Sequence, residues 1–263
     1  MVTSVIDELY IYPIKSLPGL SVDELNFGSL GVENDREFVL VNAQGRFISQ
    51  RSHPALAAFH LSDNHSTWQV SSLNKNCIEI PKQSYTDKAM AISVWKDQAT
   101  AYEVDPLISR WFSELLDETV HLVRFDELSS RKVEKGGFQG HFAFADGFPL
   151  LVCNSNSLSE INQNAPSDLS MQRFRPNIVL AMPENEEYKA RSISFAKGGE
   201  LKLVEPCVRC NIPAINPETT VFEKPIHEYL KAAINRGGKP VFGMNAIIHQ
   251  LRTIRKGEQC IIE

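Results

Sequence analysis

The sequence has little that would favour a nucleic acid, a membrane or the secretory route. Its 263 residues include 27 Lys and Arg against 32 Asp and Glu, a net charge of −5, so the chain as a whole does not attract anionic polymers or lipid surfaces. No stretch approaches the run of about eighteen apolar residues that a membrane helix needs. The N-terminus lacks the basic start, apolar run and small-residue cleavage site of a signal peptide. We therefore expect a cytoplasmic protein with no nucleic acid and no membrane partner, in which any anion-binding site is local.

Cysteine is also scarce, and its number is odd. Thinly spread cysteines in a chain without a secretory signal are typical of thiols and not of a disulfide framework. The five are Cys77, Cys153, Cys207, Cys210 and Cys260.

The composition that is present, 43% hydrophobic and 22% charged, describes an ordinary globular protein. Its length allows one large domain or two modest ones. Short alternating segments rich in Val, Ile and aromatic residues, divided by Gly, Asn, Asp and Pro, predict strands. These segments are residues 4–14, 37–49, 57–62, 67–73, 77–81, 89–95, 239–251 and 257–263.

Helical periodicity occurs in three segments, residues 104–118, 155–163 and 226–235. In the first, Asp105 is a suitable N-cap before a proline, and in the second, Ser157 and Glu160 fit a capping box. Three helices among about a dozen strands predict an α+β fold that is predominantly β.

The best candidate for a domain boundary is the polar, glycine-containing stretch 129–140. A loop of this kind is equally typical of an active-site flap. We predict two domains, residues 1–125 and residues 126–263.

Two cysteines three residues apart, Cys207 and Cys210, lie in the segment EPCVRCNIPAINPETT, residues 205–220. A structural zinc site needs four ligands, and no second pair accompanies this one. A thioredoxin-like dithiol normally precedes a helix, whereas this pair runs into two prolines that exclude one. The cysteines could be ordinary buried residues. Alternatively, Arg209 favours a thiolate at Cys210 on a stiff loop, which would suit a metal ligand.

Several other short stretches place cationic and polar residues in apolar company. Each alone is typical of a solvated strand end or a helix cap. Together, Lys and Arg with Ser and Asn donors could hold a phosphate or a multiply charged heterocycle. The residues are Lys15, Ser16, Arg36, Arg51, Asn154, Ser155, Arg173, Arg175 and Asn177.

Read in order, these stretches resemble the MOSC family, named for the C-terminal domain of molybdenum cofactor sulfurase. In particular, the chain resembles the bacterial YcbX proteins and the mitochondrial amidoxime-reducing components. The motifs occur in family order over almost the whole chain. They are YPIKS (12–16), NDREFVLV (34–41), FADGFPLLV (144–152), RFRPNIVL (173–180), CVRCNIPAINPETT (207–220) and FGMNAI (242–247).

This resemblance implies an N-terminal β-barrel-like domain and a C-terminal MOSC β-barrel, with a molybdenum cofactor (Mo-molybdopterin) between them. The first strands, up to about Arg36, would pack with the C-terminal barrel. In the family the second motif cysteine binds molybdenum, which makes Cys210 the catalytic metal ligand and leaves Cys207 structural or behind it. The positions that match cofactor contacts are Lys15, Ser16, Arg36, Asp146, Gly147, Phe148, Arg175 and Asn177, with Asn154 and Ser155 in a neighbouring polar segment.

The implied activity is the reduction of small N-hydroxylated compounds, such as amidoximes, hydroxylamines and N-hydroxylated bases. The chain has no C-x4-C-x2-C run of the ferredoxin type, so no iron-sulfur cluster is expected, and electrons would come from a separate flavin or iron-sulfur protein. Pyridoxal phosphate is not expected, because nothing matches the N-terminal half of the sulfurase. The alternative is a cofactor or sulfur carrier that uses the motif cysteine without turnover, and a zinc-stabilised binding module is a third possibility.

Overall fold

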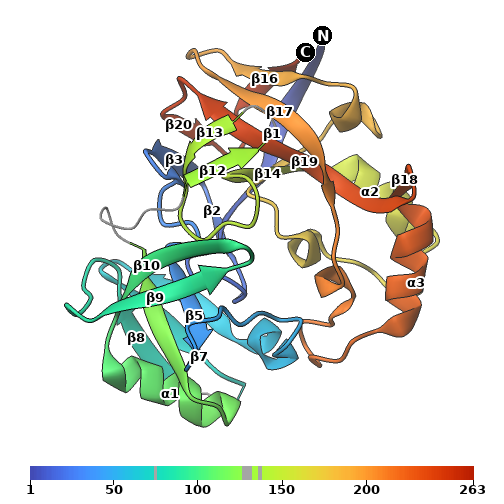
Figure 1. Ribbon diagram of the computed structural model, residues 1–263. Coiled ribbons are helices and arrows are strands. Elements are labelled where there is room, and N and C mark those ends of the chain that lie inside the picture. Colours follow the sequence, from blue (N-terminus) through green and yellow to red (C-terminus); the bar gives the residue numbers. More distant parts are fainter. Residues whose placement is uncertain (74–75, 126–131, 136–137) are drawn as a thin grey trace.

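The computed structural model describes residues 1–73, 76–125, 132–135 and 138–263. It has two parts, a barrel that contains both chain ends and a smaller β-rich domain beside it (Figure 1). Strands outnumber helices throughout, and the described residues contain three α-helices. The predicted α+β fold, predominantly β, is therefore confirmed. None of the described helices has the length and apolar content required to cross a membrane.

The barrel is closed by seven strands. Their order around the barrel is β14–β15–β1–β21–β16–β17–β19, and β19 pairs with β14 to complete the circle. Among these seven barrel strands, β14 and β15 form the one parallel pair, and the other neighbouring pairs are antiparallel. The bounds are β1 Val2–Ile11, β14 Leu150–Asn154, β15 Ile178–Leu180, β16 Ser192–Phe195, β17 Glu200–Val208, β19 Lys239–His249 and β21 Gln259–Ile262.

The first strand of the chain belongs to this barrel, where β1 pairs with β15 and β21. Its side chains alternate between two cores, as the period of a strand requires. Leu9 and Ile11 join the main core, whereas Tyr10 and Tyr12 join a second core beneath α2 and α3. Two residues beyond Tyr12, Ile14 forms a bridge to Phe38 at the start of the smaller domain, so Tyr12 lies where the two parts of the molecule meet.

The smaller domain contains a four-stranded sheet and a three-stranded sheet, with helix α1 (Pro106–Leu116) packed against β11. The four-stranded sheet consists of β5 Phe38–Asn42, β11 Val120–Arg124, β10 Asp97–Glu103 and β9 Ala89–Val94. The three-stranded sheet consists of β6 His60–Asn64, β7 Thr67–Ser71 and β8 Cys77–Pro81. Residues 54–58 form a 3₁₀ helix, so the predicted strand at 57–62 begins only at His60.

The remaining strands are short. Two of them extend the barrel sheet, β2 (Leu20–Val22) beside β1 and β18 (Asn235–Arg236) beside β19. A three-stranded sheet contains β3 (Glu24–Gly28), β4 (Gly31–Val32) and β20 (Thr253–Arg255), and a hairpin contains β12 (Lys132–Lys135) and β13 (Phe138–His141). The stretch 129–140 falls partly outside the described residues, and the division after residue 125 stays a prediction.

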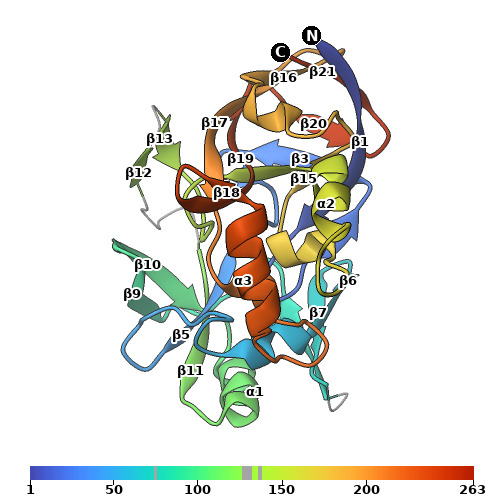
Figure 2. The same cartoon turned by 90° about the vertical axis from the view of Figure 1, so that its right-hand side faces the viewer.

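The other two helices flank the barrel. Helix α3 (Lys224–Ala233) runs along one side of the molecule with β18 at its barrel end (Figure 2). Helix α2 (Ser155–Asn162) follows β14 directly. The predicted N-cap of α1 is confirmed, because the Asp105 carboxylate accepts from Leu107 N. The predicted capping box of α2 is wrong, because Asn154 is its N-cap and Ser157 lies inside the helix.

Candidate cofactor site

The residues singled out from the sequence come together around one cavity of about 120 Å³ between the barrel and the smaller domain. They come from distant parts of the chain, because five points of the fold converge at the cavity. These are the exit from β1, the entries to β5, β14 and β15, and the end of β17. Those predicted residues are Lys15, Ser16, Arg36, Asp146, Gly147, Phe148, Arg175, Asn177 and Cys210, and Arg51 and Cys207 line the same cavity.

Lys15 and Asp146 form an ion pair across the cavity wall. The buried Lys15 ammonium also donates to Phe144 O at 2.8 Å. Trp95 Nε1 donates to Asp146 Oδ1 at 2.8 Å. Desolvation would raise the pKa of the Asp146 carboxyl, but the Lys15 charge and the hydrogen bonds from Lys15 and Trp95 outweigh it and hold that pKa well below its usual range. Asp146 is therefore an anion at all physiological pH values.

Arg36 is held by a network of buried polar groups. Its guanidinium pairs with Asp35, donates to Asn177 Oδ1 at 3.0 Å and donates to Arg175 O at 3.2 Å. Burial raises the pKa of the Asp35 carboxyl, although Arg36 and hydrogen bonds from Tyr12 N and Asn177 oppose the shift. These contacts fix the orientation of the Arg36 guanidinium before any ligand binds.

Every hydrogen-bonding group of the Asn177 side chain has a partner within the protein. Its Nδ2 donates to Tyr10 O at 3.2 Å and to Asp35 Oδ1 at 3.1 Å, while its Oδ1 accepts from Arg36 and from Leu151 N. An amide has two N–H donors and two lone pairs, so none is left over. Although Asn177 lines the cavity, it has no donor or acceptor left for a ligand. It would influence ligand binding by positioning the Arg36 guanidinium.

Arg175 has a hydrogen bond from Nη1 to Leu17 O at 2.6 Å, but no carboxylate among the described residues pairs with it. Burial, followed by the neighbouring Arg36 charge, lowers the pKa of its guanidinium to about 10. The group stays protonated at neutral pH at a cost in free energy, which an anion in the cavity would offset.

Three residues of the cavity wall have left-handed backbone conformations that side chains other than glycine rarely adopt. The φ angles are 73° at Ser16, 52° at Arg36 and 57° at Arg175. Such conformations persist only where surrounding structure enforces them, and they cluster at ligand sites.

The cysteine loop begins where β17 ends, and Arg209 anchors it. Arg209 N donates to Pro240 O at 2.8 Å, and its guanidinium donates to Phe174 O at 2.7 Å and to Cys207 Sγ at 3.0 Å. The Arg209 guanidinium thus makes its hydrogen bond to sulfur at Cys207, while its charge also lies near Cys210. Cys210 is exposed in the cavity.

In residues 211–217, directly after Cys210, the chain makes a single 3₁₀ turn, η4 (Ile212–Ala214), and no α-helix, as the prolines predict. Cys210 and Arg209 also line a neighbouring groove of about 220 Å³ between this loop and α3. His227 on α3 borders the groove and lies 3.0 Å from Asn211 Oδ1. Cys210 is thus accessible from two sides.

No group of three or more His, Cys, Asp or Glu side chains in the described part of the chain could hold a metal ion. A metal held here through Cys210 would need its other ligands from a cofactor. The donor set fits a molybdenum-pterin group, because a soft, exposed thiol suits the metal and the arginines suit an anionic phosphate.

Three residues of the basic and polar set have structural roles outside this cavity. Arg173 pairs with Glu223 at 2.9 Å and so ties the segment after the cysteine loop to η2 (Met171–Phe174). Asn154 caps α2, and Ser155 Oγ donates to Leu180 O. The helix-cap interpretation of that segment is therefore confirmed.

Trp95 was not predicted from the sequence. It lies between β9 and β10 with φ 59°, is about half exposed, and has the Arg51 guanidinium 4.3 Å from its ring centre. No motif marks it, because a single aromatic residue at a strand end is typical of many hairpins. Only the fold brings its indole to Asp146.

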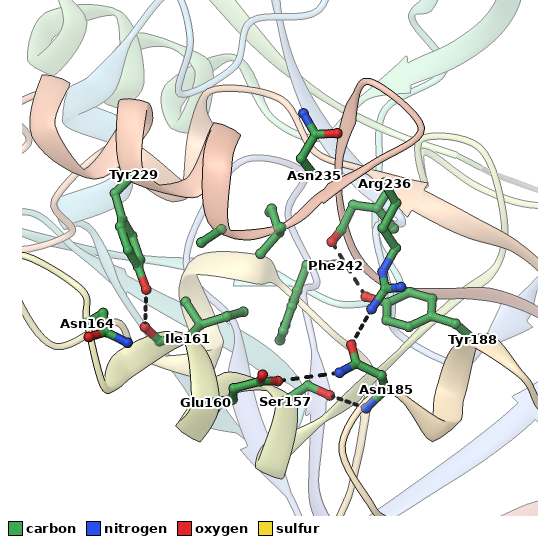
Figure 3. Close-up of a pocket in the computed structure, with 13 residues that line it drawn as sticks. Ser157, Glu160, Ile161, Asn164, Asn185, Tyr188, Tyr229, Asn235, Arg236 and Phe242 are labelled. Atoms are coloured by element: carbon green, nitrogen blue, oxygen red, sulfur yellow. Dashed lines mark hydrogen bonds between the residues drawn. The ribbon is translucent and has the colours of Figure 1, made fainter.

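A second and larger cavity, of about 360 Å³, lies between α2, α3 and the start of β19 (Figure 3). None of the residues predicted for cofactor binding lines it. Arg236 lies over the Tyr188 ring and donates to Asn185, whose amide donates in turn to Glu160 at 3.4 Å. The cationic side chain that lines this second cavity, Arg236, and its carboxylate, Glu160, are therefore linked through the Asn185 amide.

Fold and cavity together describe a two-part MOSC protein, and two family models match accordingly. The MOSC N-terminal beta barrel domain matches residues 3–119, and the MOSC domain matches residues 139–260. The chain therefore belongs to the MOSC family.

Among curated relatives, mitochondrial amidoxime-reducing component 1 of Mus musculus is 26% identical, over 95% of this chain and 80% of that protein. Its Homo sapiens counterpart is 23% identical over the same shares. Molybdenum cofactor sulfurase of Homo sapiens is 26% identical over 91% of this chain but only 29% of that protein.

Proposed function

We propose that the protein binds a molybdenum-pterin cofactor and uses it to reduce small N-hydroxylated compounds. The observation that carries the proposal is the meeting of an exposed thiol, Cys210, with five cationic side chains and a single carboxylate in one cavity. The overall charge of the protein is negative, so this local excess of cations points to an anionic ligand. The amidoxime-reducing relatives support the same class of reaction.

In this proposal Cys210 Sγ is the protein ligand to molybdenum, and Cys207 stays behind it in contact with Arg209. Arg36 and Arg175 bind the phosphate end, because planar guanidinium groups suit bidentate recognition of phosphate. Lys15 and Asp146 lie beside the pterin. The enclosed volume of about 120 Å³ would take only part of such a cofactor, and Cys210 at the exposed part of the lining would hold its metal.

The reaction is a balanced two-electron reduction. The N–O bond of the substrate breaks, two electrons and two protons enter, and water leaves. When bound, the cofactor's molybdenum supplies the two-electron chemistry. The residues of this chain orient the cofactor and leave the groove beside Cys210 for a small substrate. Electrons come from a separate flavin or iron-sulfur protein.

The test is reduction of benzamidoxime by the cofactor-loaded protein with a chemical reductant in place of the protein donor. We expect benzamidine from the wild type and from Cys77→Ala, which removes an exposed thiol outside the cavity. Cys210→Ala should lose the activity. Persulfide on Cys210 without any substrate reduction would instead support a sulfur carrier and contradict the reductase.

A further inference from the structure

We infer that Tyr12 is a positioning residue whose ring holds Arg36 and Arg175 as a clamp for a phosphate group. The inference rests on the proposed function only in taking the cofactor as the natural source of that phosphate. Its physical content concerns the free protein and is testable without the cofactor.

Both guanidinium groups lie over the Tyr12 ring. Their central carbons are 4.2 Å (Arg36) and 4.3 Å (Arg175) from its centroid, within the range of cation–π attraction. The two arginines come from different parts of the molecule, one just before β5 and one just after η2. Two like charges at one site repel each other, and the shared ring provides an attraction that keeps both of them there.

Backbone contacts fix the ring itself. Tyr12 N donates to Asp35 Oδ1 at 2.8 Å, and Arg36 N donates to Tyr12 O at 2.8 Å. Asp35 also pairs with the Arg36 side chain. Tyr12 is buried, so its position is set before a ligand arrives, and pre-organisation of this kind raises affinity.

Gly19 is the second component of this arrangement. A Cβ atom at Gly19 would lie 2.4 Å from one carbon of the Tyr12 ring and under 3 Å from two others. The backbone at Gly19 is not left-handed, so conformational freedom does not explain the glycine. It leaves the space that the ring occupies.

The Tyr12 hydroxyl has no part in the contacts that hold the two arginines. It is buried and has no hydrogen-bond partner among the described residues, and an unsatisfied hydroxyl lowers stability. The inference concerns the ring, and Tyr12→Phe tests it apart from the hydroxyl.

The experiment compares inorganic phosphate binding by calorimetry in cofactor-free, full-length protein. Tyr12→Leu removes the ring, Gly19→Ala displaces it, and Tyr12→Phe keeps it. Gly28→Ala is the matched glycine control, because a Cβ there would make an ordinary 3.5 Å contact with Glu33. Phe112→Leu removes a buried ring of the smaller domain, away from the cavity, and controls for lost stability.

We expect Tyr12→Leu and Gly19→Ala to weaken phosphate binding by about tenfold, a difference of one power of ten in Kd. The phosphate Kd of Tyr12→Phe and of both controls should stay within about twofold of the wild-type value, since these variants keep the Tyr12 ring position and its surroundings. Equal phosphate affinity in the wild type, Tyr12→Leu and Gly19→Ala would overturn the inference, as would a wild type that binds no phosphate.

A second readout is the pterin content of the same variants purified from molybdenum-replete cells. Pterin should fall in Tyr12→Leu and recover in Tyr12→Phe. If the wild type binds phosphate through Tyr12 but never contains pterin, the clamp is supported and the proposed cofactor function is contradicted.

Discussion

Two cavities border the barrel, and each contains an arginine over a tyrosine ring, but their charges differ. In the proposed cofactor cavity Arg175 lies over Tyr12 among five cationic side chains and one carboxylate. In the other, Arg236 lies over Tyr188 and is linked through Asn185 to a carboxylate. The cavity with the charge excess is the smaller one, about 120 Å³ against about 360 Å³. A local excess of cationic side chains, and not volume, therefore distinguishes the proposed ligand site.

The largest expected effect is the loss of phosphate binding when Arg175 is neutralised. Arg236, the matched arginine of the other cavity, is the control. Arg175→Gln should weaken phosphate binding tenfold or more, because a charge-assisted hydrogen bond contributes about 1.5–3 kcal/mol. Arg236→Gln should leave it unchanged. Calorimetry on both variants measures the difference, and equal losses would show that the two cavities do not differ as we describe.

A smaller effect concerns the two motif cysteines within the cofactor cavity. Cys207→Ala removes the sulfur that accepts from Arg209 and should lower the free energy of unfolding by about 1 kcal/mol, since a partly buried donor loses its partner. Molybdenum content per folded protein should stay at the wild-type value. Denaturant unfolding and metal analysis test this, with Cys77→Ala as the control, and lost molybdenum in Cys207→Ala would make Cys207 a ligand.

The smallest effect is the pH dependence of the Lys15–Asp146 pair. The pKa of Asp146 is lower in the folded protein than its usual value of 3.8, so the pair stabilises the fold above that value, and this contribution is lost as the pH falls toward the lower, folded value. Asp146→Asn should therefore reduce stability at pH 7, by less than about 1 kcal/mol because the carboxylate is largely exposed. The difference from wild type should shrink in acid.

Unfolding curves at several pH values measure this difference. Glu160→Gln in the other cavity is the control, since Glu160 accepts one hydrogen bond of 3.4 Å and has no ion pair among the described residues. A pH-independent loss in Asp146→Asn would contradict an electrostatic origin.

The sequence predicted the fold class, the three helices and the residues that meet at the cavity. The helices follow from periodicity and caps, but the grouping of Lys15, Arg36, Arg175 and Cys210 came from family resemblance. Spacing alone cannot provide it, because these residues meet only when β1 and β15 pair within the barrel while β5 starts the other domain.

Other features needed the structure. The position of Trp95 beside Asp146 depends on how two sheets approach each other, which no local pattern encodes. The saturation of Asn177 depends on four partners from three separate segments. The contact of Arg209 with Cys207 could have been predicted, however, because the strand reaches Val208 and alternation places residues 207 and 209 on one side.

The most direct test is the molybdenum and pterin content of wild-type protein from molybdenum-replete cells, measured beside Cys210→Ala. We predict that molybdenum and pterin co-purify with the wild type and with Cys77→Ala, and that molybdenum falls severalfold in Cys210→Ala because its one protein ligand is gone. Wild-type protein that contains neither molybdenum nor pterin, with Cys210 intact, would contradict the account.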